Sequence, residues 1–75
     1  MTLKREIQPM ADFVKIALED HDLMVQYTKR PPYQQNDYLG WINRAVKPET
    51  KQKRLRQMLD ELKNGHLYMN MKYSG

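Results

Sequence analysis

The chain has 75 residues, a formal net charge of +4 and no cysteine. This length allows one small domain, and the missing thiols exclude disulfides and thiolate zinc sites as sources of stability. No apolar run approaches the ~20 residues that a membrane span needs, and the first ten residues lack the apolar stretch of a secretory signal, so we expect a cytoplasmic protein without a membrane span.

Two short helices are predicted before a pair of consecutive prolines. Residues 1–8 show no clear period and are expected to form a loose arm. Apolar residues within 10–19 recur on one helical face, and Asp12 favours the first turn through the helix dipole. Asp20 is expected to cap a second helix over 21–29, which ends before the prolines.

Two longer helices are predicted over 32–46 and 48–64, and each begins at a proline that suits a first helical turn. The residue before Pro48 avoids the α region, so the chain is expected to turn there. Val46 widens the apolar stripe of the third helix. The stripes of both helices supply the predicted core, which consists of Tyr38, Trp41, Ile42, Leu55, Leu59 and Leu62.

Two glycines fall at informative places in these helices. Gly40 lies inside the third helix, where it costs about 1 kcal/mol relative to alanine. A second helix that crosses closely at Gly40 would explain its use. Gly65 follows Asn64 and is expected to end the fourth helix in the left-handed conformation.

The last ten residues, HLYMNMKYSG, alternate apolar and polar side chains as a strand does. A lone strand has no partner here unless the N-terminal arm pairs with it, and we expect a loosely packed tail instead. The predicted architecture is all-α, a compact bundle of four short helices. It has an arm over 1–8, a helical domain over 9–65 and a tail over 66–75.

Charge is unevenly distributed along the chain. Residues 12–22 hold four acids and one cation, whereas residues 44–56 hold six cations and one acid. This asymmetry indicates either an anionic partner or two elements that neutralise each other, and we favour the second interpretation. Cations in the first turns of the fourth helix nevertheless oppose its dipole, and binding is one reason to tolerate that cost. An anion-binding or macromolecule-binding site therefore stays as the second hypothesis. Its candidate residues are Arg44, Lys47, Lys51, Lys53 and Arg54.

The stretch from residue 32 to residue 65 resembles a known family. Its landmarks are Asp37-Tyr38-Leu39, Trp41-Ile42, Ala45, Lys47-Pro48-Glu49-Thr50, Lys53-Arg54-Leu55, Leu62 and Gly65. This order of residues resembles the C-terminal helical domain of the YdeI/OmpD-associated family, also called the bacteriocin-protection family. The chain departs from the usual pattern at Lys51 and Lys53, where arginine is usual, and at Val46, where lysine is usual. The resemblance implies a helical domain linked to bacteriocin and envelope-stress protection, and it implies no reaction and no ligand.

The sequence offers no convincing catalytic or metal-binding set. His21 and His66 are far apart, and neither stands in a metal-ligand spacing. Asp60 and Glu61 are adjacent on a predicted helix and therefore point in different directions. No hydroxyl side chain stands beside a base and an orienting acid. We expect no enzyme activity, no cofactor and no metal.

Two functions remain as hypotheses. The first is a small non-catalytic helical module that binds a protein partner, in the setting that the resemblance implies. The alternative is binding of nucleic acid or another polyanion through the basic stretch 44–56. Against the alternative, the aromatic residues fall on predicted core faces and not among the cations, so bases have no obvious stacking platform.

Overall fold

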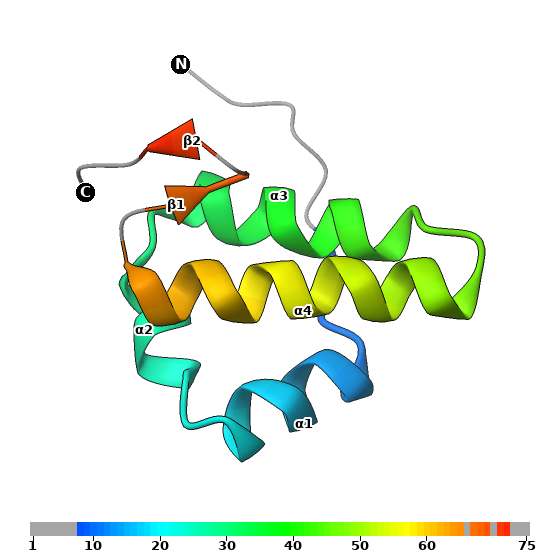
Figure 1. The fold of residues 1–75 in the computed structure, drawn as a ribbon, viewed down its shortest axis with the longest axis horizontal. Helices are drawn as coiled ribbons and strands as arrows, with labels where there is room; N and C mark the ends of the chain where they lie inside the picture. Colours follow the sequence, from blue (N-terminus) through cyan, green and yellow to red (C-terminus); the bar gives the residue numbers. More distant parts are fainter. Residues whose placement is uncertain (1–7, 66, 70, 73–75) are drawn as a thin grey trace.

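The computed structural model describes residues 8–65, 67–69 and 71–72. Its elements are α1 (Asp12–Asp20), α2 (Met24–Lys29), α3 (Pro32–Asn43), α4 (Pro48–Asn64), β1 (Leu67–Tyr68) and β2 (Met71–Lys72). The predicted all-α bundle of four helices is confirmed, with one very small hairpin added at its C-terminal end (Figure 1). Residues 1–7 of the predicted arm lie outside the described residues.

The centre of the fold is the pair α3 and α4, which lie side by side and run in opposite directions (Figure 1). Pro32 and Pro48 are their first helical residues, as expected from the fixed φ of proline. Gly65 ends α4 with φ 78°, which is the predicted left-handed conformation. The two longest helices therefore begin where the sequence predicts.

The end of α3 differs from the prediction. The helix stops at Asn43, and residues 44–47 turn the chain toward Pro48. Ala45 is buried in this turn, whereas Val46 is 91 % exposed and does not widen the apolar stripe. Lys47 is extended, as expected before a proline (φ −89°, ψ 142°), but α3 already ends at Asn43, where the side chains of Lys51 and Arg54 bond its last carbonyls.

The turn between α1 and α2 also differs from the prediction. Asp20 is the last residue of α1 and does not cap α2. The N–H of Leu23 donates to the carbonyl of Leu18 (2.8 Å), and the N–H of Asp22 donates to the carbonyl of Glu19 (3.1 Å). These two bonds form a Schellman motif, with Asp22 left-handed at φ 57°. Aspartate tolerates this conformation, and the leucines on either side of the turn, Leu18 and Leu23, are both part of the buried core cluster.

The core lies between all four helices. Of the six predicted core residues, Tyr38, Ile42, Leu55 and Leu62 are buried. Trp41 and Leu59 are only partly buried and pack against the margin of the core. Val14 and Leu18 of α1, both 0 % exposed, and Met58 of α4 complete its centre. Trp41 therefore belongs to the edge of the core and not to its interior.

The close neighbours of Gly40 are side chains and not the expected second helix. No helix crosses at this point among the described residues. A Cβ added at Gly40 would lie 3.1 Å from the Cγ of Gln8 and 3.0 Å from a terminal nitrogen of Arg44. The segment before α1 is held there because the N–H of Gln8 donates to the Oδ1 of Asn36 (2.7 Å).

The tail is more ordered than expected where the structure describes it. β1 and β2 pair with each other in antiparallel register, Leu67 with Lys72 and Tyr68 with Met71. β1 also packs against α4 (Figure 1). The ring of Tyr68 makes edge-to-face contacts with Tyr33 and Tyr38, and its hydroxyl donates to Asp37 (2.6 Å). The predicted strand in the tail therefore pairs with a second strand of the tail and not with the N-terminal arm.

Candidate functional site

Two of the five predicted site residues cap the C-terminal end of α3. The side chain of Arg54 donates to the carbonyl of Trp41 (2.6 Å), and its guanidinium lies over the indole, 5.4 Å from the ring centroid. The Nζ of Lys51 donates to the carbonyl of Asn43 (3.1 Å) and lies 3.5 Å from that of Ile42. Both side chains extend from the start of α4 onto its neighbour.

These contacts complete the hydrogen bonding of α3. The last four carbonyls of a helix have no partner within it. In α3, the backbone N–H groups of Arg44 and Ala45 satisfy two of these carbonyls, those of Gly40 and Ile42. The cations of α4 satisfy the other two, those of Trp41 and Asn43.

The same contacts explain why cations are crowded into the first turns of α4. A cation there is unfavourable toward the dipole of α4 itself. Because α3 and α4 are antiparallel neighbours, the start of α4 lies beside the negative end of α3. The partners of Lys51 and Arg54 are therefore carbonyls of α3. The sequence instead suggested that acids elsewhere in the bundle neutralise them.

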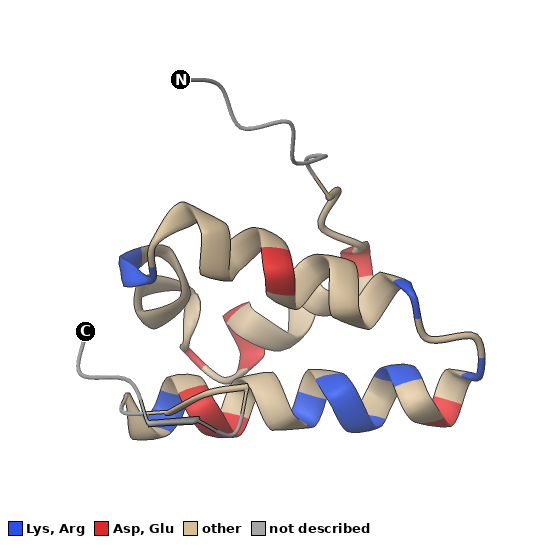
Figure 2. Ribbon diagram, turned by 90° about the horizontal axis from the view of Figure 1, so that it is seen from above, with Lys and Arg blue, Asp and Glu red and all other residues tan. Residues whose placement is uncertain are grey.

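The other three predicted site residues remain at the surface. Arg44, Lys47 and Lys53 are exposed, and Figure 2 shows the Lys and Arg residues grouped along the first half of α4 and in the connection before it. Arg44 and Lys47 flank the exposed Val46 at the end of the molecule. The structure thus divides the predicted set into two capping residues and three solvated ones.

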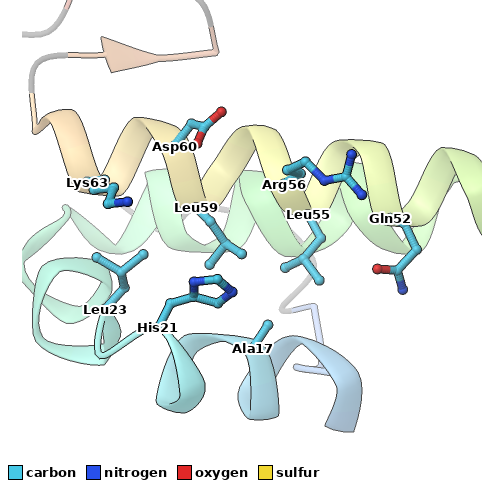
Figure 3. A pocket seen from close by; sticks show the side chains of 9 residues that line it. All are labelled: Ala17, His21, Leu23, Gln52, Leu55, Arg56, Leu59, Asp60 and Lys63. Carbon is cyan, nitrogen blue, oxygen red and sulfur yellow. The ribbon is translucent and has the colours of Figure 1, made fainter.

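A groove lies on another side of α4, between this helix and α1 (Figure 3). Its volume is about 380 Å³. Ala17 of α1, Leu23 of the turn after it, and Leu55 and Leu59 of α4 form an apolar floor. The rim is polar and includes His21, Gln52, Arg56, Asp60 and Lys63. None of these lining residues belongs to the predicted anion site.

The orientation of the rim residues decides what the groove can do chemically. His21 reaches from the end of α1 toward Leu59, and Arg56 and Lys63 stand on the α4 side (Figure 3). The carboxylate of Asp60 points away from His21 (Figure 3). The groove therefore presents apolar surface between a histidine and two cations.

A buried polar cluster near the C-terminal end of α4 was not among the sites predicted from the sequence. Glu61 is 2 % exposed, and its carboxylate accepts hydrogen bonds from the hydroxyl of Tyr38, from Gln57 (3.1 Å) and from the N–H of Met69 (2.8 Å). The carbonyl of Glu61 accepts from the buried Arg30 (2.9 Å). Burial, together with the hydrogen bond to Glu61, raises the pKa of Tyr38 above its ordinary value.

A sequence signal for this cluster existed. Glu61 stands three residues after Met58 and beside Leu62, so the helical period already placed it on the buried face. Asp60, the residue before Glu61, is exposed, which agrees with the prediction that the two side chains point in different directions. The cluster joins α3, α4 and the tail, and its polar groups form hydrogen bonds with one another.

Metal and membrane sites can be assessed only for the described ranges. Within 8–65, 67–69 and 71–72, no group of three or more histidine, cysteine, aspartate or glutamate side chains could hold a metal ion. In the same ranges, no helix has both the length and the apolar character to cross a bilayer. His66 lies outside the described residues.

Comparison with models of known protein families identifies a match over the helical domain. The model of a family described as OmdA, bacteriocin-protection, YdeI or OmpD-associated, matches residues 9–65, which is more than half of the chain. No match was found among curated proteins. None was found among solved structures either.

Proposed function

The chain belongs to the bacteriocin-protection family, YdeI or OmpD-associated, and from this membership we propose that it is a small non-catalytic helical module that binds another protein in bacteriocin or envelope-stress protection. The observation that carries the proposal is the open groove between α1 and α4. Its floor of aliphatic side chains is the kind of surface on which a protein segment docks.

The arrangement of ionisable groups supports the non-catalytic part of the proposal. Acid–base catalysis requires a proton donor or acceptor that is within hydrogen-bond reach of the reacting group and has a suitable neighbour. In the groove, His21 faces Leu59, while the carboxylate of Asp60 points elsewhere. The carboxylate of the buried Glu61 already accepts hydrogen bonds from the hydroxyl of Tyr38 and from the N–H of Met69 in the tail.

Polyanion binding through residues 44–56 is the less well supported function. Lys51 and Arg54 are engaged with carbonyls of α3, so they are not free to neutralise phosphates without a loss of stability. The half-buried Trp41 is covered by Arg54 on one face, which removes a stacking surface for bases. Retention on heparin that falls steeply with salt would reverse this preference.

The test is survival under bacteriocin challenge in cells that lack the gene and carry it back as a variant. Ala17→Gln places a longer side chain in the groove at a helical position, and Ile16→Gln is the matched control because Ile16 is 55 % exposed and does not line the groove. We expect the wild type and Ile16→Gln to protect, and Ala17→Gln to protect poorly.

A photo-crosslinking residue at Gln52, on the rim of the groove, supplies the physical readout of the same test. We expect it to capture a specific protein in these cells, and the same crosslinker at position 16 to capture none. If Ala17→Gln protects as well as the wild type and position 52 captures nothing specific, the proposed function is wrong.

A further inference from the structure

The groove between α1 and α4 has a charge pattern that points to the chemistry of its occupant. Arg56 and Lys63 are both exposed and both line the groove on the α4 side. They are seven residues apart, so they lie on nearly the same face of the helix, about 10 Å apart along its axis. Leu59 lies between them and contributes to the floor.

One wall of the groove is therefore a row of cation, leucine and cation. The single acid on this wall, Asp60, directs its carboxylate away from the floor (Figure 3). A segment in the groove thus meets apolar surface below and positive charge at two points along one edge. This arrangement complements an apolar stripe bordered by acids.

We propose that the groove binds an amphipathic, acidic helical segment of a partner protein. Its apolar side chains contact Leu55 and Leu59, and two acidic side chains about seven residues apart lie beside Arg56 and Lys63. This is the helix-in-groove mode of peptide recognition, in which apolar anchors recur every three or four residues. The inference rests on the proposed function, because it specifies the partner chemistry of the same groove.

A second copy of the chain fits this groove less well. Its acidic helix is α1, which carries Glu19 and Asp20 on the surface. The apolar face of α1 is used within its own core, since Val14 and Leu18 are 0 % exposed. Ile16 alone remains exposed there, which leaves too little apolar surface to cover the floor.

Nucleic acid also fits less well. The floor is aliphatic, and no Phe, Tyr or Trp side chain lines the groove to stack on a base; the one aromatic ring there is the imidazole of His21 on the rim. Phosphates spaced along a backbone would meet Arg56 and Lys63 but would leave the leucines between them exposed to water. The apolar floor therefore favours a protein segment.

The inference is tested by selecting random 16-residue peptides on the full-length wild-type chain alone, and then measuring how the enriched peptides bind the double variant Arg56→Glu/Lys63→Glu. Both replaced side chains are exposed, so the fold is expected to survive. The control is Lys47→Glu/Lys53→Glu, which changes the net charge equally at exposed positions outside the groove. Arg56→Gln/Lys63→Gln serves as a second, milder variant if the charge reversal impairs folding.

We expect the selected peptides to carry apolar residues at helical spacing and acids about seven residues apart. Binding measured by titration should weaken at least tenfold in the Arg56/Lys63 variants and stay within twofold of the wild type in the Lys47/Lys53 control. On binding, the methyl resonances of Leu55 and Leu59 should shift in nuclear magnetic resonance spectra.

The proposed occupant is wrong if no peptide is enriched, if the enriched peptides lack acids, or if the Arg56/Lys63 variants bind them as tightly as the wild type. It is also wrong if the groove methyls shift with protein concentration alone, since a second copy would then be the occupant. A protein crosslinked at Gln52 that still binds the Arg56/Lys63 variants would overturn the acidic occupant and leave the proposed function standing.

Discussion

Replacing Arg54 with alanine should destabilise the fold, although Arg54 belongs to a stretch that resembles a solvated basic surface. The substitution removes a charge-assisted hydrogen bond to the carbonyl of Trp41, which typically contributes ~1.5–3 kcal/mol. It also removes the cation–π contact with the indole, worth about 0.5–1 kcal/mol at such a site. The expected loss in the free energy of unfolding is therefore ~2–4 kcal/mol.

A loss of this size is readily measured in so small a domain. A chain of this length has a total stability of roughly 4–11 kcal/mol, and each kcal/mol corresponds to about 4–8 °C in the melting temperature. The assay is urea denaturation followed by circular dichroism and by the fluorescence of Trp41, the only tryptophan in the chain. The melting temperature should fall by at least about 8 °C.

The matched control is Lys53→Ala, one residue earlier on the same helix and exposed. Its effect should stay within about 0.5 kcal/mol, as is usual for surface substitutions. Arg54→Lys keeps the charge but loses the planar group over the indole, and it should fall between the two. If Arg54→Ala and Lys53→Ala have the same stability, the capping of α3 by α4 contributes nothing and the reasoning is refuted.

Three further predictions concern stability. Glu61→Leu should cost ~2–4 kcal/mol in urea denaturation because it leaves the buried hydroxyl of Tyr38 and the part-buried N–H groups of Gln57 and Met69 without this acceptor, whereas Asp60→Asn should change little. Burial raises the pKa of Tyr27 to about 12 from an unfolded value near 10, so the folded state holds its proton more tightly. The free energy of unfolding should consequently fall as the pH rises from about 10 to 12, and a pH series on Tyr27→Phe should show a weaker fall. Gly40→Ala should raise the free energy of unfolding by less than ~1 kcal/mol, because the gain in helix propensity exceeds the cost of displacing two side chains; a clear loss in thermal melting would contradict this.

The sequence predicted the parts of the fold that depend on local backbone chemistry. Pro32, Pro48 and Gly65 act through their own φ angles, so the helix boundaries that they set were predicted correctly. The start of α2 was predicted less well, at residue 21 instead of Met24, because the turn before it is closed by the N–H groups of Asp22 and Leu23 and not by a cap at Asp20. The left-handed conformation of Asp22 has no clear local signal, because aspartate adopts it only occasionally.

The candidate site could not be derived from local patterns. The role of Arg54 depends on the antiparallel packing of two helices, and a pattern of charges along one helix says nothing of its neighbour. The groove combines Ala17 with Leu59, which come from different ends of the sequence. Glu61 is the exception, since its position on the apolar stripe of α4 was readable before the structure.

The contacts of the tail affect where the chain can be truncated without loss of stability. The family match ends at residue 65, and a shortened version of the chain would naturally stop there. Such a version would remove the N–H of Met69 from the carboxylate of Glu61 and the hydroxyl of Tyr68 from Asp37. It would also uncover one side of the Tyr38 ring. We therefore expect a version that stops at residue 65 to have a lower free energy of unfolding than one that includes the hairpin.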